Sequence, residues 1–203
     1  MYTQNLVHNG LYFGGFSMKI TIKKFFIIII LNFGFISHLH SDDQKSELNK
    51  LFEKLKVENA SISFETEQKI WKIWSTHPKN YELTKLLDDG SELVRKNKLF
   101  ESIDLFTEVI NLDPNWAEAW NKRATAFYMI GEFQKSQNDI DKVLKLEERH
   151  FGALAGQGLV NIQLKNYEKA IESYQRALEI YPTMQSPSIM IKEIEGLIKE
   201  DLI

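Results

Sequence analysis

The chain has no cysteine among its 203 residues. This excludes disulfide bonds, thiolate metal sites, covalent haem attachment and a cysteine nucleophile, and it leaves no residue for the lipid anchor of a bacterial lipoprotein. Glycine and proline are also scarce, with 10 and 4 residues, which favours a helical chain. An apolar share of 43% and a charged share of 26% are typical of a folded globular protein.

Charge is unevenly distributed along the chain. Three lysines and no acidic residue lie before Asp42, so the remainder carries 28 acidic side chains against 22 basic ones. Proteins that bind nucleic acid mainly rely on positively charged patches to neutralise phosphates. The acidic remainder therefore predicts that nucleic acid is not the partner.

Residues 1–41 are predicted to be a signal peptide region, with Met18 as the start of translation. Lys19, Lys23 and Lys24 form a basic segment, an apolar run follows from Phe25 to Ile36, and residues 37–41 are polar. We expect cleavage after Ser41 and an exported, periplasmic protein. The alternative is an uncleaved leader that tethers the protein to a membrane, although the apolar run is shorter than the 18 or more residues expected of a spanning helix.

A period of 34 residues recurs three times after this region. Each series of positions keeps one physical type: small (Gly90, Ala124, Gly158), large or aromatic (Leu99, Phe133, Tyr167), small again (Ser102, Ser136, Ala170), large apolar (Phe106, Ile140, Tyr174) and medium apolar (Val109, Val143, Ala177). The small positions allow two helices to approach closely, and the large ones fill the space between neighbouring helix pairs. Turns within the pairs are predicted near Asn97, Gly131 and Lys165.

These positions resemble the tetratricopeptide repeat (TPR). The resemblance covers residues 83–184 and implies a right-handed α-solenoid of three helix pairs. Asn115 is predicted to cap the first helix of the second pair, with Glu118 completing a capping box. As a whole, the chain is similar to exported bacterial TPR proteins without an assigned activity.

Two further segments flank the repeats. Residues 42–82 are predicted to form a helical hairpin outside the repeat register that covers the first repeat. Residues 185–203 are predicted to form an amphipathic helix that caps the last repeat with an apolar stripe of Met190, Ile194, Leu197 and Ile198.

Catalytic and cofactor motifs are absent from the sequence. Gly152, Gly156 and Gly158 lack the Lys-Ser or Lys-Thr of a phosphate-binding loop, and neither G-x-S-x-G nor H-E-x-x-H occurs. His77 and His150 are each alone at a predicted helix end, where a surface or capping role is expected. We therefore predict that the protein is not an enzyme, and that it holds no cofactor and no metal.

The TPR resemblance implies a binding groove along the first helix of each repeat. The groove positions expected to bind a peptide are Leu87, Asn121, Thr125, Tyr128, Leu159 and Ile162. We expect Asn121 and Tyr128 to contribute most. Members of the family that clamp a C-terminal carboxylate carry Lys and Asn where this chain has Leu87 and Ser91, and basic residues at the positions of Gly152 and Gly156, so no such clamp is expected.

The predicted function is protein–protein interaction, with a peptide or partner protein of unknown identity bound in the groove and the protein acting as an envelope scaffold. The alternative is a structural or membrane-tethered assembly subunit without a groove ligand, in which the same residues only pack against the hairpin or a sister subunit.

Overall fold

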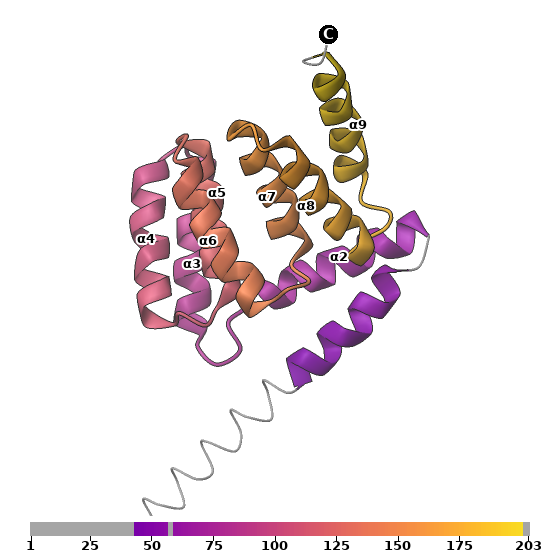
Figure 1. Cartoon of the computed structure of the whole chain (residues 1–203). Coiled ribbons are helices and arrows are strands. Elements are labelled where there is room, and N and C mark those ends of the chain that lie inside the picture. Colours follow the sequence, from indigo (N-terminus) through magenta and orange to yellow (C-terminus); the bar gives the residue numbers. More distant parts are fainter. Residues whose placement is uncertain (1–42, 57–58, 201–203) are drawn as a thin grey trace, which may run out of the picture. The chain divides into compact units, whose positions relative to one another are not determined.

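The computed structural model describes residues 43–56 and 59–200, and every regular element among them is a helix (Figure 1). A helix over residues 43–55 and α2 (Ala60–Trp74) precede the repeats. The repeats are three helix pairs: α3 (Tyr81–Arg95) with α4 (Leu99–Leu112), α5 (Ala117–Met129) with α6 (Phe133–Leu146), and α7 (Phe151–Gln163) with α8 (Tyr167–Ile180); α9 (Gln185–Glu200) follows. The prediction of an all-helical repeat fold is confirmed. The predicted signal peptide lies outside the described residues.

The turns within the three pairs share one geometry. Asn97, Gly131 and Lys165 have φ angles of 57°, 79° and 59°, so the predicted turn positions are confirmed. One residue later, a backbone N–H closes each turn on the carbonyl five residues back, as in the bond from Asn166 to Asn161 (2.7 Å). This is the arrangement of a Schellman motif, which satisfies carbonyls at the end of a helix.

Close helix contacts inside the first and third pairs depend on glycine. A Cβ atom on Gly90 would lie 2.5 Å from a ring carbon of Phe106, and one on Gly158 would lie 2.4 Å from a ring carbon of Tyr174. The second pair has a larger residue, Ala124, at the corresponding position, and the aliphatic Ile140 in place of an aromatic ring. The second repeat thus fills this helix contact differently from the first and the third, although the period is constant.

The N-terminal hairpin packs on the third repeat, and the prediction that it covers the first is wrong. Its buried residues Leu51, Phe52, Leu55, Ile70 and Trp74 form one cluster with Phe151 of α7 and Tyr181 after α8. Figure 1 shows α2 running across the ends of the repeat helices rather than stacking beside α3. Because the hairpin lacks the 34-residue pattern, it does not pack as a fourth helix pair, and it contacts the third repeat through Phe151 and Tyr181 instead.

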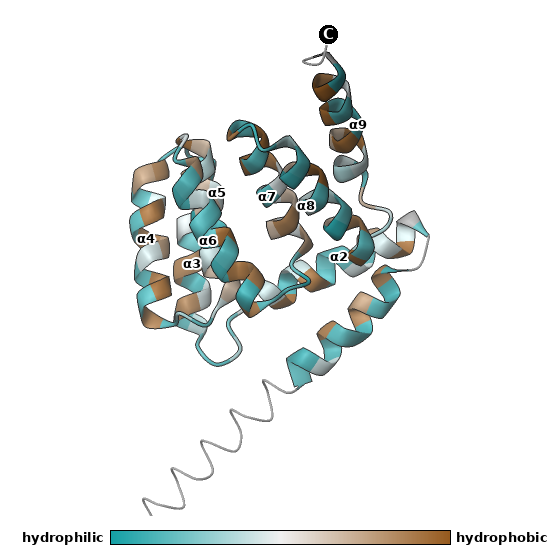
Figure 2. Cartoon of the chain, viewed as in Figure 1, coloured by the Kyte–Doolittle hydropathy of each residue, from teal (hydrophilic) through white to brown (hydrophobic). Residues whose placement is uncertain are grey.

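Helix α9 caps the third pair through part of its predicted stripe. Ile194 is buried with Ala170 and Tyr174, and Met190 and Ile198 pack against this cluster. Leu197 does not, because 44% of its surface is exposed. Hydrophobic and hydrophilic residues alternate along this helix (Figure 2). Among the described helices, none combines the length and the apolar character needed to cross a membrane.

The start of α5 also differs from the prediction. Asn115 does not cap this helix: Trp116 occupies the N-cap position and makes no side-chain capping bond. The carboxylate of Asp113 instead accepts a hydrogen bond from the backbone N–H of Asn115 (2.9 Å). Glu118 is buried and its carboxylate contacts Lys122, His150 and Asn121, and no capping-box hydrogen bond is formed at this helix start.

Candidate functional site

A small cavity lies between the second and third repeats, on the side of α5 and α7. Four of the six predicted groove residues line it. We call it the groove cavity; its lining residues are Asn121, Ala124, Thr125, Tyr128, Ser136, Ile140, Gly152, Ala153, Gly156 and Leu159. It encloses about 80 Å³ and has no charged residue in its wall.

The other two predicted groove residues lie elsewhere. Leu87 is fully buried in the core of the first repeat, with Phe106 and Val109, so its placement on a binding surface is wrong. Ile162 is partly buried and packs towards the cluster of α8 and α9 that contains Tyr174. Helix α7 therefore contributes to two sets of contacts: its Leu159 lines the groove cavity, whereas its Ile162 packs against the cluster of α8 and α9.

The four residues around the cavity are unequally accessible. Thr125 and Leu159 are exposed, Tyr128 is partly buried with its ring 5.5 Å from that of Phe133, and Asn121 is only 9% exposed. The amide nitrogen of Asn121 donates to Glu118 at 3.1 Å, so one of its two expected donors is already used. Thr125 and Leu159 are therefore the more accessible contacts, and Asn121 supports the wall of the cavity.

Beside the cavity, Glu118 is the centre of a buried polar cluster. One carboxylate oxygen lies 3.0 Å from His150 Nε2, and the other lies 3.1 Å from Lys122 Nζ. Burial raises the pKa of the Glu118 carboxyl, but the hydrogen bond from His150 and the charge of Lys122 outweigh it and leave the pKa below its ordinary value. The carboxylate is therefore ionised at neutral pH, and it neutralises Lys122.

The hydrogen bonds of His150 identify its tautomer. Its Nδ1 accepts the backbone N–H of Ala153 (3.0 Å), so the ring proton lies on Nε2 and is donated to Glu118. The imidazole also stacks on the indole of Trp74, with centroids 3.9 Å apart. The predicted capping role of His150 is confirmed, but the residue is fully buried and links α7, α5 and the hairpin.

The hairpin contacts Gly152, one of the residues that line the groove cavity. A Cβ atom on Gly152 would lie 2.5 Å from a ring carbon of Trp71, so the indole occupies the space that a side chain would take. The ammonium of Lys122 lies 5.9 Å from the centre of the same ring. Trp71 therefore covers the surface of α7 at Gly152.

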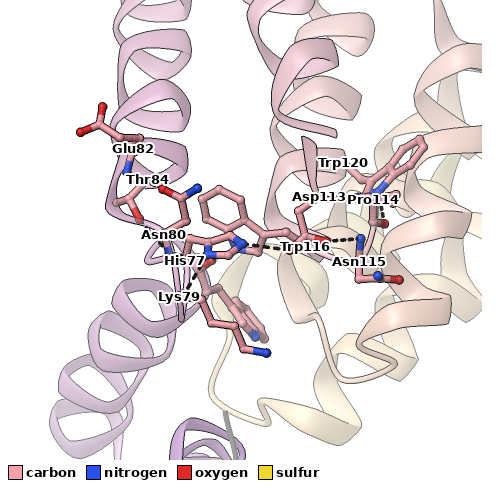
Figure 3. A network of polar contacts seen from close by, with 11 residues as sticks. His77, Lys79, Asn80, Glu82, Thr84, Asp113, Pro114, Asn115, Trp116 and Trp120 are labelled. Atoms are coloured by element: carbon pink, nitrogen blue, oxygen red, sulfur yellow. Dashed lines mark hydrogen bonds and ion pairs between the residues drawn. The ribbon is translucent and has the colours of Figure 1, made fainter. Parts of the chain in front are cut away.

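A second histidine organises the junction before the first repeat (Figure 3). His77 Nδ1 accepts the backbone N–H groups of Lys79 and Asn80, and its Nε2 donates to Asp113 at 2.9 Å. The indole N–H of Trp116 bonds to the carbonyl of Trp74 at 2.8 Å. These contacts join the end of α2 to the junction between the first and second repeats, and they explain why His77 is buried.

The sequence did not predict that Glu118, His150 and Trp71 lie together beside this site, because their contacts join residues far apart along the chain. Glu118 and His150 are 32 residues apart, so they do not hold equivalent positions in a period of 34 residues. Trp71 precedes the repeats, and the period makes no statement about its contacts. The sequence signal that could have indicated this packing is the pair of tryptophans on α2, Trp71 and Trp74. Within the described part of the chain, no group of three acidic or histidine side chains is arranged to hold a metal ion.

The family model of the tetratricopeptide repeat matches residues 152–184. A TPR repeat-containing protein of Rhizobium etli is 31% identical over 147 residues, and the match covers 70% of each chain. Hsp70-Hsp90 organizing protein 1 of Glycine max is 30% identical over 98 residues, which cover 48% of this chain and 17% of that protein.

Solved structures show the same arrangement of helix pairs. The first TPR domain of Spaghetti (RPAP3), bound to the HSP90 peptide SRMEEVD, matches with a TM-score of 0.56 and 22% identity, covering 58% of this chain and 93% of that domain. The crystal structure of MamA matches with a TM-score of 0.55 and 24% identity, covering 68% of this chain and 81% of that one. At these identities the likeness concerns the fold.

Proposed function

Because the chain belongs to the tetratricopeptide repeat family, we propose that it is a protein–protein interaction module that binds a segment of a partner polypeptide at the groove cavity. The observation that carries this proposal is the convergence of Asn121, Thr125, Tyr128 and Leu159 around one open cavity between two repeats. Peptides bind such surfaces through a few buried anchors surrounded by polar contacts.

The relatives support this choice of function. A solved TPR domain of the same fold holds an HSP90 peptide, and proteins of this family and fold are generally non-catalytic interaction modules. For this chain, we still predict that it has no enzymatic activity and does not bind nucleic acid. The identity of the partner does not follow from these likenesses, because the chain spans only 17% of the Hsp70-Hsp90 organizing protein that it matches.

We further propose that the protein is exported and serves as a scaffold in the cell envelope. The support is the basic segment and apolar run of residues 18–36. N-terminal sequencing of the protein from its host tests this proposal, with a mature start at Asp42 as the expected result. An intact leader in the membrane fraction would favour the membrane-tethered alternative.

The binding surface is tested with two matched variants. Leu159 and Leu146 have similar exposed fractions, 37% and 40%, but only Leu159 lines the groove cavity. Affinity capture from host extracts should lose its specific partner with Leu159→Ser and keep it with Leu146→Ser. Both variants should melt within a few degrees of the wild type, because exposed substitutions cost about 0.5 kcal/mol or less.

Retention of the partner by Leu159→Ser would move the interface away from the cavity. That result would favour the alternative of an assembly subunit, which could assemble through the exposed apolar residues Ile189 and Leu197 of α9.

A further inference from the structure

We propose that the groove cavity is a seat for one aliphatic side chain of the bound segment, and that Gly156 creates it. This inference rests on the proposed function and adds the chemistry of the ligand. Four observations support it: the unfilled space at Gly156, the size of the cavity, the lack of charged residues in its wall, and the position of Trp71 against Gly152.

Gly156 differs from the other glycines on α3 and α7. The space in front of Gly90, Gly152 and Gly158 is filled by Phe106, Trp71 and Tyr174, each less than 3 Å from where a Cβ atom would be. A Cβ atom on Gly156 would meet only Ile140 Cδ1, at 3.8 Å, which is an ordinary contact. Packing within the protein therefore does not require glycine here. The open space instead belongs to the groove cavity, which both residues line.

The size of the cavity selects among apolar side chains. Its volume of about 80 Å³ is roughly half that of an apolar cavity of about 150 Å³ that holds benzene. A branched aliphatic side chain is the suitable occupant, since an aromatic ring would need more room. The floor that it would contact is formed by Ile140, Ala124 and Ala153, which are nearly or fully buried.

The charges around the cavity indicate an uncharged ligand at this point. Lys122, the neighbour of Asn121 on α5, is paired with the buried carboxylate of Glu118 and lies over the ring of Trp71. The peptide SRMEEVD held by a solved TPR domain of the same fold is acidic. This chain has no unpaired basic residue in the cavity wall to match such a peptide.

Trp71 determines how the segment can enter. The indole covers Gly152, and its helix is anchored by the buried residues Ile70 and Trp74. The bound segment therefore cannot continue past Gly152. It reaches the cavity across the exposed residues Thr125 and Leu159, and its aliphatic side chain lies at Gly156.

A phage-displayed library of random heptapeptides, panned against the full chain, tests this inference. We expect the selected peptides to share one Val, Ile or Leu without an acidic C-terminus. Gly156→Leu should fill the cavity and weaken their binding by about tenfold or more. Gly196→Leu is the matched control, because it adds the same side chain to a helical glycine on α9 with open space around it, and it should leave their binding unchanged.

Gly156→Ala gives a second, milder test that does not depend on the larger substitution folding well. It should weaken the selected peptides less than Gly156→Leu does, while it raises the melting temperature of the protein. An acidic or aromatic consensus, or unchanged binding by both Gly156 variants, would overturn the aliphatic seat.

Leu159→Ser in the same assay separates a failure of the aliphatic seat from a failure of the proposed function. If this variant loses the selected peptides while both Gly156 variants retain them, the groove binds polypeptide but without an aliphatic seat. If no peptide is enriched, or if Leu159→Ser binds as the wild type does, both the seat and the proposed function are wrong.

Discussion

The indole of Trp74 stacks on the imidazole of His150, with ring centroids 3.9 Å apart and planes 8° from parallel. This contact joins residues from the hairpin and the third repeat. The Nε2 atom of the same imidazole bonds to Glu118 in the second repeat. One side chain thus connects three parts of the chain. The hairpin therefore packs in one core with α7, whose residues Gly152, Gly156 and Leu159 line the groove cavity.

The first prediction concerns the attachment of the hairpin. Trp74→Ala should lower the free energy of unfolding by about 3–5 kcal/mol, because it removes a buried ring that contacts His150, Phe151 and Phe52. Urea unfolding measures the loss. Phe64→Ala removes an aromatic ring from the same helix, but this ring is 60% exposed, so a loss of about 0.5 kcal/mol or less is expected. Equal losses in the two variants would contradict the docking of the hairpin.

The second prediction concerns pH. The pKa of Glu118 is lower in the folded protein than in the unfolded chain, so ionised Glu118 stabilises the fold above a pH of about 4.5. This contribution is lost as the pH falls through the lower, folded-state pKa. Glu118→Gln should therefore make the unfolding free energy less dependent on pH in the acid range, as measured by urea unfolding from neutral to acid pH.

Glu148→Gln is the control for that experiment, because it removes one negative charge from an exposed position. A Glu118→Gln protein that loses stability with acid as steeply as the wild type would contradict the role of the buried carboxylate.

The third prediction compares two glycines on one helix. Gly158→Ala should destabilise the protein by about 1–3 kcal/mol, because the added methyl group would collide with the ring of Tyr174. Gly156→Ala lies two residues away, has room for the methyl group, and should stabilise the helix by up to about 1 kcal/mol. Thermal unfolding followed by circular dichroism separates the two. Melting temperatures that shift in the same direction would show that helix propensity, and not packing, governs both positions.

The fourth prediction concerns the turn at Lys165. This residue has a φ of 59°, a conformation that costs a side-chain-bearing residue about 1–2 kcal/mol. Lys165→Gly should raise the unfolding free energy by about 0.5–1 kcal/mol, since the relief of strain exceeds the entropy that glycine gains in the unfolded chain. Lys169→Gly, inside α8, should instead be destabilising by about 1 kcal/mol. A loss of stability in both variants would contradict the strain at Lys165.

Much of the repeat region follows from the sequence alone. The period of 34 residues predicted three helix pairs, and the three turn residues are found where it placed them. These features depend on contacts between segments that are close in the sequence, and such contacts recur whenever the period does. Of the candidate site, Thr125, Tyr128 and Leu159 were expected in a groove from the resemblance to the tetratricopeptide repeat, and all three line the cavity.

Only the tertiary structure decided where the hairpin packs and which groove positions stay open. The docking of Trp71 and Trp74 joins segments about 80 residues apart, and no period links them. Leu87 and Asn121 hold the same repeat position and both are buried, but Leu87 packs in the core of the first repeat whereas Asn121 lines the groove cavity. The sequence determined the repeating unit, since its contacts are local. The shape of the cavity depends on how one non-repeating hairpin fits against three similar but unequal repeats, and only their packing in three dimensions shows this.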